Sequence, residues 1–261
     1  MGKITQALKK AAEERLERLD RVIKIHEHDK LIVRKMKDST IDARLIAYFD
    51  QKSVISEQYK MLATNLQAIN KTKSQRIIGI TSSIHSEGKT VSSLNIAITL
   101  AQAVNKPKIL LIDADMRRGK LAKYLGVKQD KGLSEILSGQ AQVNDVLFHI
   151  DLENLTFMAA GAVPANPAEL MASEPMKDLL SQLRGQFDYI LIDTPPVIPV
   201  TDSVIISSLV DGMVVVVQAG RTQRGMVKRT AEQLEQAHAK IFGYVLTGIE
   251  YFVPDYIYRY L

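Results

Sequence analysis

The stretch Thr81–Thr90, TSSIHSEGKT, ends in the residue types that close a phosphate-binding loop. Such a loop reads G-x-x-x-x-G-K-[ST], and Gly88, Lys89 and Thr90 supply its end, whereas Ser83 replaces the first glycine. In a loop of this kind the lysine reaches the β- and γ-phosphates and the hydroxyl binds Mg²⁺. We expect the phosphates of a nucleotide to contact six consecutive residues: Ser86, Glu87, Gly88, Lys89, Thr90 and Val91.

Three aspartates follow two other apolar runs. KILLIDADMRRG contains Asp113 and Asp115, and FDYILIDTPP contains Asp193. Because open α/β sheets bind ligands at the carboxyl ends of their strands, these carboxylates should lie beside the loop. Asp193 has the place of a Walker B aspartate, which holds Mg²⁺ directly or through water. Loop and aspartates together predict a site for a nucleotide and Mg²⁺.

Alternating strands and helices must position these residues. Short β-rich apolar runs predict buried strands at 76–83, 108–115, 155–161, 189–196, 212–219 and 241–248. Apolar spacing predicts helices at 56–69, 89–104, 168–185, 201–209 and 224–238. The alternation predicts an α/β P-loop NTPase fold, with a doubly wound, mostly parallel sheet covered by helices on both faces.

The first 55 residues have a different pattern. From Ile4 to Ile23, apolar residues recur every three or four positions among charged ones, which predicts an amphipathic helix that packs on the domain or a partner, or contacts a membrane surface. Residues 24–55 have no clear period. We therefore expect an N-terminal helical arm and linker over 1–55, a P-loop domain over 56–250 and a tyrosine-rich tail over 251–261.

Composition excludes several classes of protein. The chain has no cysteine, which excludes disulfides, thiol nucleophiles and cysteine-held zinc or iron–sulfur clusters. It lacks a secretory signal pattern, and no apolar run approaches the roughly 20 residues of a membrane span, so we expect a cytoplasmic protein. The net charge of +5 is mild, without the arginine clusters and interleaved aromatics of nucleic-acid binders, and we expect no nucleic-acid partner.

The three motifs, in this order, resemble the ParA/MinD superclass of deviant P-loop ATPases. Within it, the chain is most similar to the bacterial tyrosine kinases that regulate capsule and exopolysaccharide synthesis. The match lies in EGKT, LLIDADMRRG, KGLSEILSG, AGAVPANPAELM, FDYILIDTPPVIPVTD and the tyrosine-rich end. ATPases of the superclass that position plasmids or division proteins carry a signature lysine where this chain has Ile84. Its absence favours the tyrosine-kinase branch.

The resemblance implies an ATP-dependent protein-tyrosine autokinase that needs Mg²⁺ and regulates exopolysaccharide or capsule polymerisation and export. Lys89 and the three aspartates would be catalytic. Asp113 resembles the family's candidate base, whereas Asp115 and Asp193 resemble its magnesium carboxylates and would act with Thr90. The resemblance also implies a membrane-embedded polysaccharide co-polymerase as activator, and thereby a peripheral location at the inner face of the cell membrane.

The tail YFVPDYIYRYL supplies four candidate phosphoacceptors: Tyr251, Tyr256, Tyr258 and Tyr260. The last predicted strand should run parallel, so the tail should leave the sheet at the nucleotide face. The nine residues from Thr247 to Tyr256 reach at most roughly 30 Å. Such a tether could enter a neighbouring subunit's site at an effective concentration around millimolar. An aromatic tail packed on the sheet edge is the alternative.

The chain departs from the family pattern at three places. His85 and Ser86 stand where the family loop usually has Pro-Gly, which restricts the backbone if φ must be positive and predicts weaker nucleotide binding. Thr247 stands where an asparagine commonly contacts the base. The oligomer motif E-x-x-R-x-x-R is reduced to Glu57, Lys60 and Ala63, and one lysine does not replace two guanidinium forks.

These departures leave three functions open. We expect homo-oligomerisation through the Glu57–Lys60 helix to be weaker than in the family, because the motif is reduced. The autokinase is the favoured interpretation. A ParA/MinD-like switch ATPase and a weakly active or non-catalytic nucleotide-binding regulator of the polysaccharide machinery are the alternatives.

Overall fold

The computed structural model describes residues 34–35, 41–73, 76–150, 152 and 154–249. By internal contacts the chain divides into residues 1–32 and 33–261, and every described residue belongs to the second unit. The predicted arm helix and the four tail tyrosines lie outside the described residues. In the part of the chain that is described, no helix has the length and apolar character needed to cross a bilayer.

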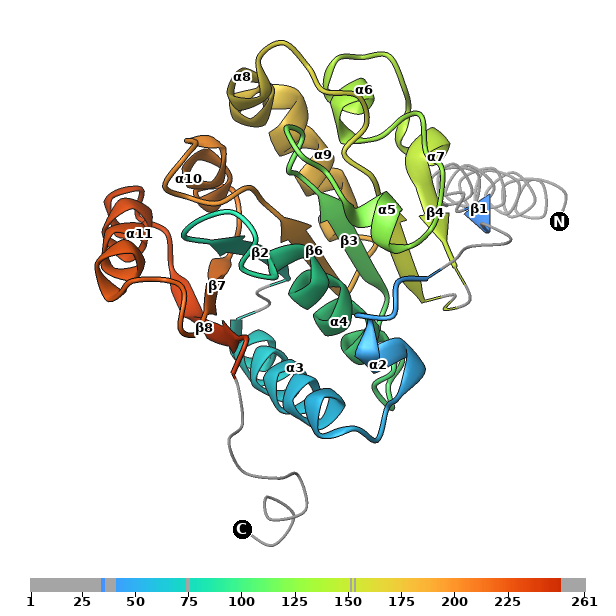
Figure 1. Cartoon of the computed structure of the whole chain (residues 1–261). Helices are drawn as coiled ribbons and strands as arrows, with labels where there is room; N and C mark the ends of the chain where they lie inside the picture. Colours follow the sequence, from blue (N-terminus) through green and yellow to red (C-terminus); the bar gives the residue numbers. More distant parts are fainter. Residues whose placement is uncertain (1–33, 36–40, 74–75, 151, 153, 250–261) are drawn as a thin grey trace, which may run out of the picture. The chain divides into compact units, whose positions relative to one another are not determined.

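Within these ranges the strands form one sheet of eight, in the order β1-β4-β5-β3-β6-β2-β7-β8 (Figure 1). Their bounds are β1 Arg34–Lys35, β2 Ile77–Ser82, β3 Ile109–Asp113, β4 Leu147–His149, β5 Leu155–Met158, β6 Tyr189–Asp193, β7 Gly212–Gln218 and β8 Ile241–Thr247. All neighbouring pairs are parallel except β4 and β5. The predicted mostly parallel sheet is confirmed.

Helices connect these strands. Their bounds are α2 Ile46–Phe49, α3 Val54–Lys73, α4 Lys89–Ala101, α5 Leu121–Tyr124, α6 Leu133–Leu137, α7 Val143–Val146, α8 Pro167–Ala172, α9 Glu174–Arg184, α10 Asp202–Ser207 and α11 Arg224–Gln236. The helix predicted over 168–185 is two helices, because Ser173 is extended (φ −73°, ψ 156°). In one continuous helix the ring of Pro175 would collide with the carbonyl of Met171.

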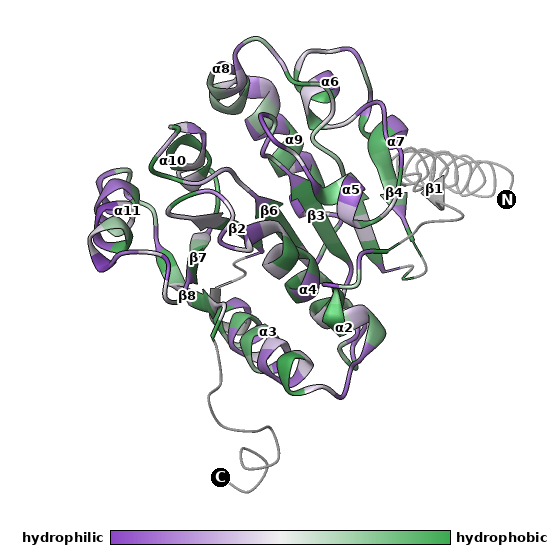
Figure 2. Cartoon of the chain, viewed as in Figure 1, coloured by the Kyte–Doolittle hydropathy of each residue, from purple (hydrophilic) through white to green (hydrophobic). Residues whose placement is uncertain are grey.

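Apolar side chains bury the sheet on both faces. Ile78 and Ile80 of β2 pack with the apolar residues of α3 and α4 in one cluster. Met213 and Val215 of β7 join Leu234 of α11 in a cluster on the other face. Figure 2 shows the central strands as predominantly apolar. Burial on both faces explains why these strands lack the alternating pattern of half-exposed strands.

Part of the segment expected to be a linker contributes to the core. Leu45 and Ala47 are fully buried beside α4. The N–H of Ala47 donates to Oδ1 of Asn95 (2.9 Å), and the same side chain donates to the carbonyl of Arg44 (3.1 Å). The packed core therefore includes residues before Ser56, where the sequence pattern places the start of the domain.

The register of the central strands determines where the site can form. β6 lies between β3 and β2, and Asp193 pairs in register with Asp113 on one side and Ile80 on the other. All three strands are parallel, so the loop after β2 and the aspartates of β3 and β6 lie at the same edge of the sheet. This is the edge at which open α/β sheets bind ligands.

Candidate nucleotide-binding and catalytic site

The loop between β2 and α4 has the backbone of a phosphate-binding turn. Gly88 is the N-cap of α4 and has φ 87°. Ser86 also has a positive φ, of 65°, a conformation that glycine adopts freely and that other residues adopt at a cost of about 1–2 kcal/mol. Ser83 is fully buried, and its hydroxyl accepts a hydrogen bond from Thr230 of α11 (2.9 Å). Ser83, which stands in place of the first glycine, thus connects the loop to α11 by a hydrogen bond.

Glu87 stabilises the loop on the side that faces away from the cleft. Its buried carboxylate accepts hydrogen bonds from the N–H of Ile84 (2.7 Å), the N–H of Gln218 (3.3 Å) and the hydroxyl of Thr222. Thr247, at the end of β8, donates to the Glu87 carbonyl (2.7 Å). Thr247 therefore holds the loop against the sheet, and Glu87 directs its side chain away from the space that a nucleotide would enter.

Asp193 accepts hydrogen bonds from three side chains in the first two turns of α4. One carboxylate oxygen accepts from Nζ of Lys89 (2.9 Å) and from the Ser93 hydroxyl (3.0 Å). The other accepts from the hydroxyl of Thr90 (2.6 Å). Asp193 has no solvent-exposed surface, so its charge depends on these partners.

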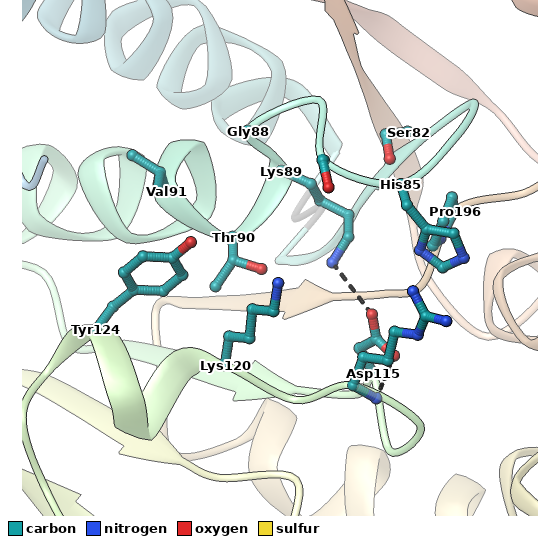
Figure 3. A pocket seen from close by; sticks show the side chains of 12 residues that line it. Ser82, His85, Gly88, Lys89, Thr90, Val91, Asp115, Lys120, Tyr124 and Pro196 are labelled. Atoms are coloured by element: carbon teal, nitrogen blue, oxygen red, sulfur yellow. Dashed lines mark hydrogen bonds and ion pairs between the residues drawn. The ribbon is translucent and has the colours of Figure 1, made fainter.

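Lys89 stays charged in this buried position. Burial opposes its charge, but attraction to Asp193 and, more weakly, to Asp115 outweighs the burial and raises the pKa of Lys89. Its Nζ lies 3.9 Å from Oδ2 of Asp115 (Figure 3). The lysine therefore points from the base of the loop to both aspartate motifs.

Asp113 is the most perturbed carboxyl group of the site. Burial, and then repulsion by Asp193, raises its pKa to about 7. Its oxygens accept the N–H groups of Asp115 (3.1 Å), Lys120 (2.9 Å) and Leu121 (3.0 Å). Asp113 thus shapes the loop between β3 and α5, and a pKa near neutrality is suitable for a general base.

A solvent-open cleft lies in front of this network. Figure 3 shows Lys89 and Thr90 facing Asp115 and Lys120 across it. The lining residues are Ser82, His85, Ser86, Gly88, Lys89, Thr90, Val91, Asp115, Arg118, Lys120, Tyr124 and Pro196.

The structure separates the predicted site residues into two groups. Ser86, Gly88, Lys89, Thr90, Val91 and Asp115 line the cleft. Glu87, Asp113 and Asp193 do not line it. Asp193 and Asp113 accept hydrogen bonds from the lining residues Thr90 and Asp115, and Glu87 accepts one from Ile84 of the loop. Arg118, Lys120 and Tyr124 also line the cleft and were not predicted from the sequence, although the first two follow Asp115 within five residues.

The cleft residues fit a magnesium-bound nucleotide. Lys89, Arg118 and Lys120 bring positive charge to the space in front of the α4 N-terminus, whose free N–H groups favour phosphate. The Thr90 hydroxyl and the Asp115 carboxylate are hard oxygen donors, which Mg²⁺ prefers in small number together with water and phosphate oxygens.

Comparison with known proteins decides the family. A family model described as an AAA domain matches residues 75–241. Tyrosine-protein kinase CpsD of Streptococcus agalactiae is 36% identical over 207 residues, which are 79% of this chain and 89% of CpsD. The chain belongs to the bacterial tyrosine-kinase family. The resemblance predicted from the motifs is thereby confirmed.

A longer relative belongs to the same bacterial tyrosine-kinase family. Tyrosine-protein kinase ptk of Acinetobacter johnsonii is 34% identical over 219 residues, which are 84% of this chain but 29% of ptk. The chain therefore spans less than a third of that protein.

Solved structures agree with the family and the predicted fold. The kinase domain of Escherichia coli tyrosine kinase ETK is 28% identical, with a TM-score of 0.77 over 88% of this chain and 94% of that one. The chimerical protein CapA2B2 is 29% identical, with a TM-score of 0.76 over 84% and 95%. The cell division ATPase MinD of Pyrococcus furiosus, at 26% identity, has a TM-score of 0.57 over 66% and 71%. This member of the bacterial tyrosine-kinase family thus has the P-loop fold that it shares with MinD.

Proposed function

We propose that this protein transfers the γ-phosphoryl group of Mg·ATP to tyrosine hydroxyls of a neighbouring copy. The observation that carries the proposal is the network of Lys89, Thr90 and Asp193 at the base of a cleft that also contains Asp115. The proposed acceptors are the four tail tyrosines: Tyr251, Tyr256, Tyr258 and Tyr260.

The reaction needs few chemical groups from the protein. A bond forms between the phenolic oxygen and the γ-phosphorus, the bond from that phosphorus to the β–γ bridging oxygen breaks, and ADP leaves. Catalysis of this kind rests on positioning and charge neutralisation, for which Lys89 supplies a fixed cation. Mg²⁺, held in our proposal by Thr90, Asp115 and Asp193, neutralises phosphate charge when it is bound.

The phenolic proton needs an acceptor. A phenol with a pKa near 10 is a weak nucleophile at neutral pH. We assign the proton to Asp113 because its pKa of about 7 lies near the working pH. Asp113 lies behind the cleft, and the N–H of Asp115 donates to it (3.1 Å), so the proposed base is in contact with the proposed magnesium ligand.

The family context supports a biological setting. We propose that the protein regulates exopolysaccharide or capsule polymerisation, and that a membrane-embedded co-polymerase recruits it to the inner face of the membrane and activates it. Support comes from the match to the chimerical protein CapA2B2 and from ptk, of which this chain covers only 29%. Association of copies through the helix that carries Glu57 and Lys60 is part of the same proposal.

One experiment tests the reaction. The protein is incubated with Mg·ATP, alone and with the cytoplasmic segment of its co-polymerase, and phosphotyrosine is mapped by mass spectrometry. We expect signal on the tail. It should be lost in Lys89→Ala, in Asp115→Asn, which keeps the side chain's size, and in a variant with all four tail tyrosines changed to Phe.

The same samples separate the alternatives. ATP turnover without phosphotyrosine would establish a switch ATPase, the alternative that the structural similarity to MinD supports. Nucleotide binding without turnover, with the co-polymerase segment present, would establish a non-catalytic regulator.

A further inference from the structure

A second ion pair lies beside the catalytic network. Nε of Arg117 donates to Oδ2 of Asp202 (2.8 Å), and Nη2 donates to Oδ1 (3.1 Å). The Asp202 side chain is 1% exposed, whereas that of Arg117 is 39% exposed. The pair is bidentate, a geometry that fixes the relative orientation of the two groups as well as their distance.

One end of this pair belongs to the loop that carries Asp115. Arg117 is two residues beyond Asp115, and the next residue, Arg118, donates its N–H to the Asp115 carboxylate (3.0 Å). Gly119 packs so closely that an added Cβ would lie 2.7 Å from Cβ of Ala160 and 3.0 Å from Oδ2 of Asp113. The loop is therefore tightly packed, and a displacement of Arg117 is transmitted to Asp115.

The other end belongs to the segment after Asp193. Asp202 is the first residue of α10, and the hydroxyl of the next residue, Ser203, donates to the carbonyl of Pro195. Thr81 of β2 donates to the same carbonyl (2.8 Å). Pro195 is two residues beyond Asp193, so the pair joins the loop of one aspartate motif to the segment that follows the other.

We propose that Arg117 and Asp202 act as a positioning pair that fixes Asp115 relative to Asp193 for magnesium-dependent nucleotide binding and catalysis. Neither side chain lines the cleft, and each acts through another residue, so we assign the pair a positioning role. The pair acts through the two carboxylates that we assign to Mg²⁺, and in this respect it rests on the proposed function.

The alternative is an ion pair that only stabilises the fold, and the chain offers a matched control for it. Nη2 of Arg184 lies 2.9 Å from Oδ1 of Asp211, with an arginine side chain 40% exposed. This pair joins the end of α9 to the residue before β7, and thus lies at the amino-terminal edge of the sheet, opposite the cleft. The two arginine side chains are equally exposed, but only the pair of Arg117 lies near the aspartates, and its carboxylate is the more deeply buried (1% against 19% exposed).

The test compares Arg117→Gln with Arg184→Gln in the full chain. The first readout is binding of a fluorescent ADP analogue as a function of Mg²⁺ concentration, which needs no kinase activity. The second is kcat and KM for ATP, and the third is Tm. Arg117→Lys and the double variant R117Q/D202N complete the set, since the double variant does not leave a buried, unpaired carboxylate.

We expect Arg117→Gln to raise the half-saturating Mg²⁺ concentration about tenfold and to lower kcat by a similar factor, because loss of a group that orients a metal ligand typically costs 10–100-fold. KM for ATP should stay within twofold. Arg184→Gln should lower Tm but leave Mg²⁺ dependence and kcat within twofold. The double variant should recover Tm but not kcat, and Arg117→Lys should be intermediate because lysine lacks the fork.

Two results overturn the inference: equal effects of Arg117→Gln and Arg184→Gln on every readout, or recovery of both Mg²⁺ dependence and kcat in the double variant. Failure of the proposed function is distinguishable. A wild-type protein without phosphotyrosine would refute the kinase, while the Mg²⁺ dependence of nucleotide binding would still decide the role of the pair.

Discussion

At the scale of single residues, Ser86 is the position where the loop and its sequence conflict. The family's usual glycine is absent, yet the backbone keeps the positive φ that glycine favours. Ser83, which also replaces a glycine, is not among the residues with positive φ, and its hydroxyl contacts Thr230. Of the two serines that replace glycines in this loop, only Ser86 adopts the backbone conformation that favours glycine. The sequence pattern alone does not show this difference.

Replacement of Ser86 by glycine should stabilise the protein. The positive φ costs about 1–2 kcal/mol for a serine, and glycine loses about 0.5–1 kcal/mol through its freer unfolded state, which leaves a gain of up to about 1.5 kcal/mol. The measurement is urea unfolding, together with nucleotide affinity, which should improve. Ser83→Gly is the control and should destabilise the protein. A loss of stability in Ser86→Gly would contradict the assigned backbone strain.

Asp113 should make stability depend on pH. Its pKa of about 7 in the folded protein lies above the ordinary value of 3.8, so between these values the folded state binds a proton that the unfolded state lacks. The contribution of Asp113 is therefore full below pH 4 and is lost as the pH rises to 7, with a slope approaching 1.4 kcal/mol per pH unit. In metal-free, nucleotide-free protein, the difference in unfolding free energy between the wild type and Asp113→Asn should change by this slope. A pH-independent difference would contradict the raised pKa.

At the scale of elements, long apolar segments were predictable and short ones were not. The strands and helices around the loop and the aspartates have runs or periods that exceed a helical turn, and they form where expected. Helices α5, α6 and α7 have four or five residues, too few for a periodic pattern. Arg118 and Lys120 reach the cleft from the loop before α5, and Tyr124 reaches it from α5 itself. The path of this segment depends on hydrogen bonds to Asp113, which cannot be read from spacing.

Glu135 shows how one such short element is held. Glu135 is 8% exposed, and its carboxylate accepts the N–H groups of Gly132 (2.7 Å) and Ala162 (3.0 Å), which connects α6 to the loop after β5. Glu135→Ala should lower the free energy of unfolding by about 1–3 kcal/mol, because two backbone donors lose their acceptor. Glu174→Ala, which removes an exposed pair with Lys177, should cost less than about 1 kcal/mol. Equal costs in chemical denaturation would contradict the role of Glu135.

At the scale of the whole molecule, the cleft lies on the sheet edge where β8 ends. Thr247, the last residue of β8, holds the phosphate loop through the Glu87 carbonyl (2.7 Å), and the chain leads from there to the tail tyrosines. The motifs indicated this arrangement because parallel strands end at one edge. What they could not supply is the second layer of contacts, such as Glu87 and Arg117, since these depend on residues more than 80 positions away.

Transfer between two copies is the central claim, and a mixing experiment tests it most directly. Lys89→Ala keeps the tail but lacks the cation of the site, and the variant with Phe at 251, 256, 258 and 260 keeps the site but lacks the acceptors. Each is incubated with Mg·ATP, alone and mixed, with the co-polymerase segment present and Tm confirming that both are folded. We predict phosphotyrosine only in the mixture, on the tail of the Lys89→Ala chain. Phosphotyrosine in the wild type but not in the mixture would contradict transfer between copies. Absence of phosphotyrosine in the wild type as well would contradict the proposed kinase activity.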